Sequence, residues 1–290
     1  MLSYRNINYK NDTDEIVRLL RTSLSDNHTK EFFTWKHYNN PFGKSYGLLA
    51  CDGNRIVGVR MFMRWVFTKG DEQLRAIRPV DTITHPDYRG RGIFKKLTLK
   101  GLEDCKDEYD LIFNTPNENS LPGYLKMGWH RYNRNLDYFL GFSLKKSGLE
   151  GDIVDITDLP VQNYVENKGC WNTRKSREFL EWRYKSNDYK AFSYSVDIKN
   201  TFGIIYKLVK IRNFRTIVII EELGSTEHFK KALSKLCSLE KTHLYYFLKN
   251  NTNSCNLSIK RNSSVVVIKE DEYDLGKELI FSTGDLEGKL

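Results

Sequence analysis

Two segments of this 290-residue chain are similar to each other, and this repeat restricts the possible folds more than any other feature of the sequence. The segment EFFTWKHYNNPFGKSY at 31–46 aligns with EFLEWRYKSNDYKAFSY at 178–194, and RIVGV at 55–59 aligns with TFGII at 201–205 through Gly58 and Gly203. Solenoid repeats recur roughly every 20 to 50 residues, so this much longer spacing favours a duplicated domain over a solenoid. Chance similarity between two amphipathic helix-to-strand segments is the alternative. The pairs that stand 147 positions apart are Glu31 and Glu178, Phe32 and Phe179, Trp35 and Trp182, Lys36 and Arg183, and Asn40 and Asn187.

The length of the chain agrees with two domains of about 150 residues each. Between about 145 and 170, Gly148, Gly151 and Pro160 interrupt a polar segment, which is typical of a linker. We therefore predict domains at 1–147 and 148–290. Hydrophobic residues form 40% of the chain and aromatic residues 13%, which is enough for a packed core in each domain.

Charge and cysteine content narrow the class of protein. The formal net charge of +9 suggests an anionic ligand or partner. The five cysteines are widely spread without a CxxC pair, so neither a disulfide framework nor a zinc site is indicated, and no metal is expected. The N-terminus lacks the apolar segment of a signal peptide, and no run approaches the ~18 apolar residues of a membrane span. We therefore expect a cytoplasmic protein that does not enter a membrane.

The first half of the chain contains a sheet followed by a basic loop. Three extended stretches separated by tight turns, YGLLACDG, RIVGVRMFMRWVF and LRAIRPVDTITH, predict an antiparallel meander. Then comes HPDYRGRGIFKKL at 85–97, and the apolar spacing from Ile93 to Cys105 predicts a helix directly behind it. A short strand at 109–115 and a helix through NENSLPGYLKMG follow.

The joint between strand and helix at 85–93 has the chemistry of an anion site. A helix N-terminus has unpaired N–H groups and a partial positive charge, and glycines let an anion approach them. Gly90 and Gly92 stand at this joint with two arginines, Arg89 and Arg91, as forked donors. A basic turn on a solvated face is the alternative. The stretch has neither GxxxxGK[ST] nor the third glycine of a dinucleotide fingerprint, and RGG tracts that bind RNA are repetitive and disordered, which argues against nucleic acid.

The second half lacks this feature. Its strand TIVIIEELG at 216–224 runs directly into STEHFKKALSKLCSL, with Glu221 and Glu222 at the joint. Two carboxylates there repel phosphate, so only the first copy is expected to bind an anion at this place.

These residues resemble two motifs of the GNAT N-acetyltransferase superfamily. R89-G-R-G92-I-F after an extended strand is similar to the R/Q-x-x-G-x-G/A signature, with Phe94 in place of the last Gly/Ala, a departure similar to variants in the Eis-like, tandem-domain branch. N117-E-N-S120-L-P-G-Y124-L-K126-M-G128-W129 is similar to the segment after the fifth strand of that superfamily. The resemblance covers about residues 3 to 142. It implies an α+β fold whose mixed, largely antiparallel GNAT sheet is flanked by helices, with a second, degenerate GNAT-like copy behind it.

The resemblance also implies the ligand and its contacts. Backbone amides of the loop hold the pyrophosphate of acetyl-CoA, and the Asn of the second motif contacts the pantetheine arm. The cofactor-binding residues implied are Thr84, His85, Arg89, Gly90, Arg91, Gly92, Ile93, Phe94, Asn117 and Ser120.

In this family a neutral amine attacks acetyl-CoA directly in a ternary complex. The resemblance implies that Tyr124 is the proton donor to the departing sulfur, since a phenol donates well to a thiolate. The alternative is that Tyr124 is only an aromatic side chain that packs the helix against the core. Asp81, which interrupts an apolar run, is our predicted base. An Asp that only pairs with its backbone or with Arg78 is the alternative, and water is another route for the proton. The C-terminal carboxylate of Leu290 is a further base that Eis-like relatives suggest.

The acceptor follows only by family analogy. A small-molecule primary amine is expected, with an amino sugar or nucleotide-linked amino sugar first. The alternatives are a module that binds CoA or another polyanion without catalysis, and an aminoacyltransferase of the Fem type.

Overall fold

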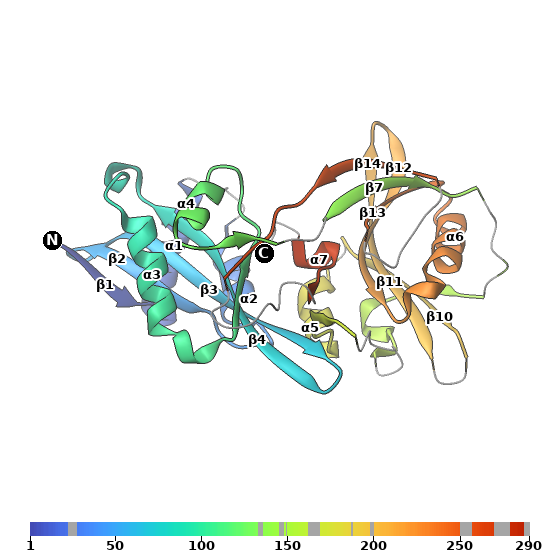
Figure 1. Cartoon of the computed structure of the whole chain (residues 1–290), viewed down its shortest axis with the longest axis horizontal. Helices are drawn as coiled ribbons and strands as arrows, with labels where there is room; N and C mark the ends of the chain where they lie inside the picture. Colours follow the sequence, from blue (N-terminus) through green and yellow to red (C-terminus); the bar gives the residue numbers. More distant parts are fainter. Residues whose placement is uncertain are drawn as a thin grey trace.

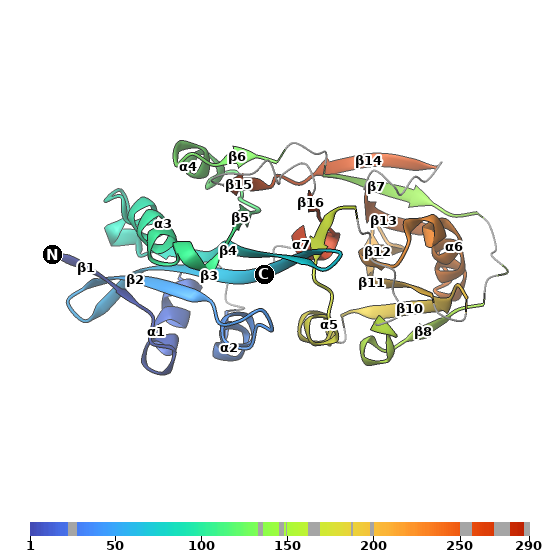
Figure 2. The same cartoon turned by 60° about the horizontal axis from the view of Figure 1, so that its bottom comes forward.

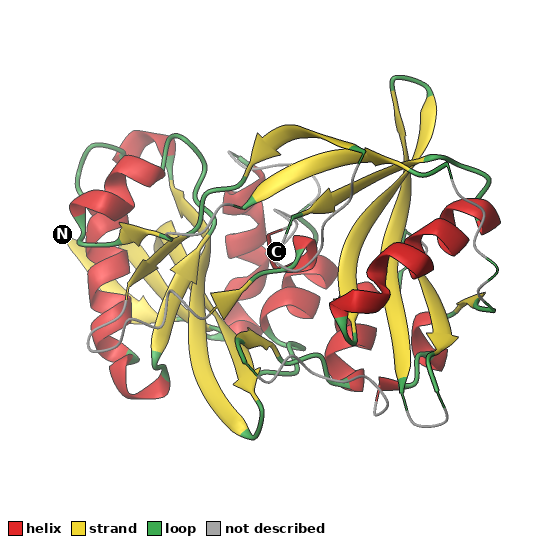
Figure 3. Ribbon diagram, turned by 45° about the vertical axis from the view of Figure 1, so that its right-hand side comes forward, coloured by secondary structure: helices red, strands yellow, loops and turns green. Residues whose placement is uncertain are grey.

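The computed structural model describes residues 1–22, 28–132, 136–144, 148, 150–161, 169–186, 188–197, 200–249, 257–269 and 279–286. Two mixed, largely antiparallel sheets lie side by side and are flanked by helices, which confirms the predicted α+β class (Figure 1). Helices α2, α5 and α7 lie between the two sheets (Figures 1 and 3).

The first half of the chain contributes β1 (Leu2–Asn6), α1 (Tyr9–Arg21), α2 (Lys30–His37), β2 (Tyr46–Asp52), β3 (Arg55–Lys69), β4 (Glu72–Thr84), α3 (Ile93–Asp104), β5 (Leu111–Asn114), α4 (Leu121–Lys126), β6 (His130–Arg131) and β7 (Asp137–Phe142). The second half contributes β8 (Asp152–Val154), β9 (Trp171–Thr173), α5 (Arg177–Tyr184), β10 (Lys190–Ser195), β11 (Thr201–Ile211), β12 (Phe214–Leu223), α6 (Phe229–Leu239), β13 (Leu244–Leu248), β14 (Ser258–Ser263), β15 (Val267–Lys269), β16 (Leu279–Ile280) and α7 (Thr283–Leu286).

The first sheet contains the predicted meander. Strands β1 to β4 pair antiparallel in chain order, β5 joins β4 in parallel, and β15 and β6 follow. Helices α1 and α2 cover one face of this sheet, and α3 and α4 cover the other (Figure 2). Side chains of β3 alternate between the faces: Met61 and Met63 pack with the cluster that includes α1 and α2, and Phe62 packs with the cluster that includes α4.

The sheets exchange strands between the two halves of the chain. Strand β7 lies in the second sheet, between β13 and β14, and β15 lies in the first sheet, between β5 and β6. The largest hydrophobic cluster likewise contains residues of both halves, among them Ile16, Phe33, Leu180 and Ile220. The division at 147/148 stays a prediction, and the two halves share a core.

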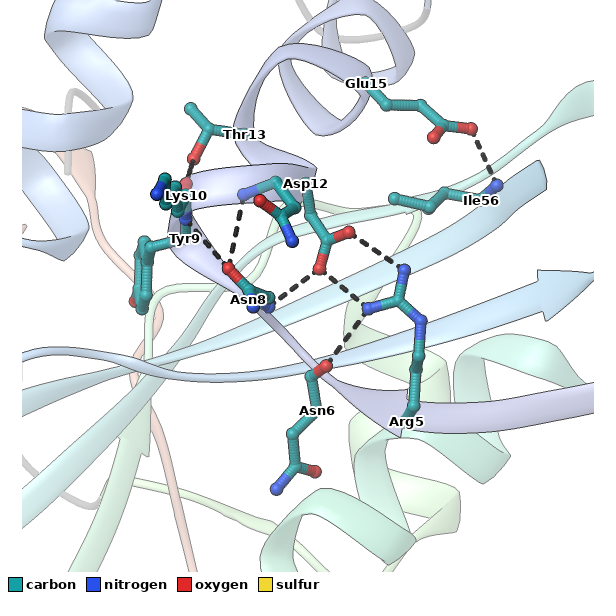
Figure 4. A network of polar contacts seen from close by, with 10 residues as sticks. Arg5, Asn6, Asn8, Tyr9, Lys10, Asp12, Thr13, Glu15 and Ile56 are labelled. Atoms are coloured by element: carbon teal, nitrogen blue, oxygen red, sulfur yellow. Dashed lines mark hydrogen bonds and ion pairs between the residues drawn. The ribbon is translucent and has the colours of Figure 1, made fainter. Parts of the chain in front are cut away.

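Polar contacts anchor α1 to the first sheet (Figure 4). The Asn8 side chain caps the helix by accepting from the backbone N–H groups of Lys10 and Asn11. Arg5 of β1 donates hydrogen bonds to both carboxylate oxygens of Asp12, at 2.7 and 2.9 Å. Glu15 Oε1 accepts from the Ile56 N–H of β3 at 2.8 Å. Strand β1 therefore ends at Asn6, because Asn8 already caps the helix that begins at Tyr9.

Helices α2 and α5, which carry the sequence repeat, pack against each other with matching contacts. The Trp35 indole N–H donates to the Trp182 carbonyl at 2.8 Å, and the Trp182 indole N–H donates to the Trp35 carbonyl at 2.9 Å. The two rings stack with their centroids 5.0 Å apart. Each helix begins at a hydroxyl cap, Thr29 or Ser176. The two repeats are thus equivalent in space as well as in sequence; Asn187 lies outside the described residues.

The strands behind these helices also correspond. The order β10, β11, β12, β13, with its last pair parallel, repeats the order β2, β3, β4, β5. Both copies have a β-bulge at the same distance from the aligned glycines. The pairings that show this are Gly58 with Thr84 and Met61 with Val80 in the first copy, and Gly203 with Leu223 and Tyr206 with Ile219 in the second. A duplicated domain explains all of these correspondences.

Candidate active site

A fork between two parallel strands opens the first sheet. Strands β4 and β5 pair only at Ala76 with Leu111 and at Ile77 with Ile112. Beyond that point β4 continues beside β3 as far as Thr84, whereas β5 stays paired with β15. The backbone of β4 from residue 78 onward therefore has no ladder partner on its β5 side in the described part of the chain.

A bulge in β4 lies opposite the fork. Asp81 and Thr82 have no register partner on β3, where the pairing steps from Val59 with Ile83 to Met61 with Val80. Asp81 adopts φ = 44°, a left-handed conformation that is uncommon outside glycine. The bulge takes two β4 residues out of the ladder within the apolar centre of the sheet.

The predicted anion loop leads from the end of β4 into α3. A 3-10 turn, Pro86–Tyr88, is followed by Gly90 at φ = 77° and Gly92 at φ = 71°, with Gly92 at the N-cap of α3. A Cβ added to either glycine would meet no atom within 4 Å, so the backbone conformation, and not crowding, favours glycine here. No side chain caps α3, and the first helical N–H groups have no acceptor within the helix. Thr84 and His85 lie at the entrance to this loop.

The basic side chains of the loop have different surroundings. The Arg91 guanidinium stacks over Tyr88 at 4.7 Å and donates to the Asp87 carbonyl at 3.2 Å. His85 Nε2 lies 2.7 Å from a guanidinium nitrogen of Arg55, a residue that sequence reasoning missed. Arg91 is thus held against its own turn, while the glycines leave the backbone exposed.

Tyr124 is buried beside the fork, at 2% exposure. Its hydroxyl oxygen accepts from Arg60 Nη2 at 2.7 Å and from Asn114 Nδ2 at 2.6 Å. The Asn114 amide is oriented because its Oδ1 accepts from the Thr115 N–H at 2.9 Å. Sequence reasoning missed both partners; a charged residue inside the apolar run RIVGVRMF was the signal for Arg60.

Phe94, the departure from the family signature, has a packing role in the structure. Its ring contacts the Tyr124 ring at 5.9 Å, edge to face, and lies where a Cβ on Gly123 would come within 3.2 Å. The phenyl group therefore joins the start of α3 to α4. Asn117 and Ser120 lie in the turn before α4, where Asn117 Oδ1 accepts from the Ser120 N–H at 2.9 Å; their contact with the pantetheine arm stays a prediction.

Asp81 faces α2 and binds two of its side chains. One carboxylate oxygen accepts from Lys36 Nζ at 2.7 Å and the other lies 2.7 Å from His37 Nε2. The second ring nitrogen of His37 is 2.9 Å from Ser45 Oγ. Burial opposes ionisation of Asp81, but the charge of Lys36 and the hydrogen bond from His37 outweigh it, so the pKa of Asp81 is lowered. The alternative pairing with Arg78 does not occur: Arg78 donates to the Asp285 carbonyl at 2.7 Å and to Thr115 Oγ1 at 2.5 Å.

The second copy has a similar contact at its own bulge. Glu221 is buried there and accepts from the Tyr184 hydroxyl, and Tyr184 occupies on α5 the place that His37 occupies on α2. Lys175 also pairs with Glu221, at 2.6 Å. A carboxylate bound to the helix at the bulge is therefore part of the architecture of both copies. The base role predicted for Asp81 stays a prediction, and Leu290 lies outside the described residues.

The fork, the glycine loop and a buried tyrosine between them agree with a match to a family model. The model of the acetyltransferase (GNAT) domain matches residues 3–132. The chain contains a GNAT acetyltransferase domain. This domain indicates an acyltransferase, and the GNAT family implies acetyl-CoA as the acyl donor and an amine as the acceptor.

Solved structures share the fold over nearly the whole chain. A conserved protein of unknown function from Enterococcus faecalis V583, described as a probable N-acyltransferase, is 12% identical with a TM-score of 0.74, covering 93% of this chain and 73% of that one. GCN5-related N-acetyltransferases from Kribbella flavida (12% identity, TM-score 0.69, 93% and 71% covered) and Anabaena variabilis (10%, 0.70, 93% and 73%) are also similar. No curated protein matches the chain significantly. The fold of these structures therefore extends over both halves of the chain.

The described residues show neither a metal centre nor a membrane-spanning helix. They contain no group of three or more His, Cys, Asp or Glu side chains placed to hold a metal ion. Among the same residues, no helix is both long enough and apolar enough to cross a membrane.

Proposed function

We propose that the protein transfers the acetyl group of acetyl-CoA to the primary amine of a small molecule, by direct attack in a ternary complex. One observation supports this proposal above all. Strand β4 forms one side of the fork and leads directly into the glycine loop, and the buried hydroxyl of Tyr124 lies beside both. An extended thioester in the fork has its pyrophosphate at the N-terminus of α3 and its sulfur toward Tyr124. The free edge of β4 supplies backbone donors and acceptors to the pantetheine arm.

In this proposal the pyrophosphate is held by backbone N–H groups of residues 90–94, with Arg89 and Arg91 adding positive charge. The unpaired N–H groups at the start of α3 and the dipole of the helix favour an anion there. Thr84 and His85 lie where the arm passes from the fork to the loop. The second copy has Glu221 and Glu222 near the corresponding joint and does not bind acetyl-CoA.

Tyr124 is the proposed proton donor to the sulfur. Its oxygen already accepts hydrogen bonds from Arg60 and Asn114, so both lone pairs are occupied and the hydroxyl hydrogen is left for a third partner. The departing thiolate is such a partner.

The proton of the amine takes a different route. Because Lys36 and His37 lower the pKa of Asp81, its carboxylate holds a proton poorly at neutral pH. We infer that Asp81 stays paired with Lys36 and His37 and does not take the proton, which leaves through water. An amino sugar remains our first choice of acceptor, by family analogy only.

The test measures thiol release from acetyl-CoA across a panel of amines, together with calorimetric binding of CoA. Tyr124→Phe should lower kcat by roughly 10²- to 10⁴-fold, the usual contribution of a general acid, with binding of CoA unchanged. Tyr109→Phe is the control, because Tyr109 packs in the same hydrophobic cluster but donates to the Leu102 carbonyl. If CoA binds and no amine releases thiol, the non-catalytic module replaces this proposal; if CoA does not bind, both fail.

A further inference from the structure

Arg60 carries a buried positive charge inside the first sheet. Its side chain lies in β3 and the residue is 1% exposed. Among the described residues it forms no ion pair within 4.0 Å; its hydrogen bonds go to the hydroxyl oxygens of Tyr124 and Thr82. A buried cation without a counterion is costly to fold, so its presence calls for a reason.

The surroundings of Arg60 are aromatic and close to the fork. The guanidinium carbon lies 5.7 Å from the centre of the Phe62 ring, 5.2 Å from that of Phe94 and 5.3 Å from that of Tyr124. Such rings attract a cation through their electron-rich faces, which offsets part of the cost of burial. Its Nε has no hydrogen-bond partner among the described residues. Thus the guanidinium is aimed at Tyr124 and Thr82, at the bulge, and at no other polar group of the described chain.

The duplicated domain shows that the strand does not need this charge in order to fold. Counting two residues on from the aligned glycines, Gly58 and Gly203, Arg60 corresponds to Ile205. Ile205 is fully buried in β11, next to the equivalent bulge. The copy that carries the glycine loop has arginine here, and the copy that lacks it has isoleucine. The arginine is therefore found only in the copy with the proposed acetyl-CoA site, although both copies have the same strand and bulge.

We propose that Arg60 is a positioning residue that prepares Tyr124 to protonate the sulfur of CoA. This inference rests on the function proposed above. As the amine nitrogen attacks the thioester carbon, the C–S bond breaks and its electron pair moves to sulfur. Tyr124 gives its hydroxyl proton to that sulfur, which yields the thiol. The negative charge then left on the phenol oxygen is stabilised by the hydrogen bond from Arg60 Nη2, until Tyr124 regains a proton from water that has received the amine proton.

The hydrogen bond from Arg60 matters because it acts where charge develops. A charge-assisted bond in a buried site gains strength when its acceptor becomes an anion, and the removal of one such donor from an enzyme costs roughly 10²- to 10³-fold in kcat. Arg60 also keeps a lone pair of Tyr124 occupied, so the hydroxyl hydrogen stays directed at the sulfur. Neither effect requires Arg60 to touch the substrate.

The experiment is a double-mutant cycle on the full chain with Arg60→Met, Tyr124→Phe and the combination. Arg60→Met should lower kcat by roughly 10²-fold, with the KM for acetyl-CoA changed less than about threefold. In the Tyr124→Phe background the same change should have almost no effect, because the hydroxyl through which Arg60 acts is absent. Arg60→Lys keeps the charge and should recover part of the rate.

Arg64→Met is the matched control, since Arg64 lies on the same face of β3 but contacts the Lys44 carbonyl and Glu108 instead. Its kcat should equal that of the wild type. Thermal unfolding and CoA binding identify variants that fail to fold. If Arg60→Met does not fold, the cycle is made instead with Arg60→Lys, Tyr124→Phe and the double variant Arg60→Lys/Tyr124→Phe. Equal rate losses in both backgrounds, or a change confined to KM, would overturn the inference. If wild type and Tyr124→Phe behave as proposed but Arg60→Met is fully active, only this inference fails; a wild type that releases no thiol removes the proposed function as well.

Discussion

Replacing Trp182 with phenylalanine, and separately Trp35, should destabilise the protein by equal amounts. Each indole N–H donates to a carbonyl in the last turn of the opposite helix, at 2.8 and 2.9 Å. Carbonyls in the last turn of a helix have no backbone donor within the helix, so each tryptophan satisfies a group that would otherwise need water. Phenylalanine keeps an aromatic ring at the contact and removes the donor.

The size of the effect follows from these contacts. The loss of one hydrogen bond costs about 1 kcal/mol net, and weaker ring stacking costs about 0.5 kcal/mol more. Each single variant should therefore lose about 1.5 kcal/mol of unfolding free energy. The double variant should lose about 2.5 kcal/mol, less than the sum, because the stacking of one indole on the other is lost only once.

Urea unfolding of the full chain, followed by far-ultraviolet circular dichroism, measures these free energies without relying on tryptophan fluorescence. Each single variant is the control for the other, because both substitutions remove the same kind of hydrogen bond from equivalent positions of the repeat. A loss below about 0.3 kcal/mol, typical of an exposed site, would refute the paired-contact reasoning for that tryptophan. Single losses that differ by more than about 1 kcal/mol would refute the equivalence of the two helices.

Two further predictions concern the site. Gly92→Ala should lower the unfolding free energy by about 1 kcal/mol and raise the KM for acetyl-CoA roughly tenfold, because alanine strains the positive φ and shifts the loop amides. The control is Gly70→Ala, at φ = 60° in the turn between β3 and β4, where a Cβ is equally uncrowded. It should lower the unfolding free energy by the same amount and leave the KM unchanged. Asp81→Asn should lower the unfolding free energy by about 3 kcal/mol, since it removes one partner of a buried ion pair. The pKa of Asp81 is lowered in the folded state, so its contribution is complete above the unfolded value of about 3.9 and is lost only as the pH falls through the lower folded value. Urea unfolding should show the same deficit at pH 7 and pH 5; a deficit that shrinks at pH 5 would contradict the lowered pKa.

Local chemistry made part of the site readable from the sequence. Arg89, Gly90, Arg91 and Gly92 stand in one uninterrupted stretch between a strand pattern and a helix pattern, so the loop needed no knowledge of distant residues. The glycines do adopt positive φ, and the loop does open α3. The repeat was equally visible, because the duplication left identical residues at one fixed spacing. That its two aligned tryptophans, Trp35 and Trp182, contact each other was not predicted.

Only the tertiary structure decided which groups pair with the buried charges and which strands the two sheets exchange. Arg60 is 64 positions from Tyr124, and Lys36 is 45 from Asp81; such pairings depend on which strands and helices meet, and no local pattern encodes that. The placement of β7 in the second sheet and of β15 in the first could not be predicted for the same reason, since a strand of three to six apolar and polar residues can pair with either sheet until the whole core forms. The sequence alone thus determined the loop, the repeat and the class of fold, because these depend on neighbouring residues. The fold decided what surrounds Tyr124 and Asp81, because burial and charge at those side chains come from residues far along the chain.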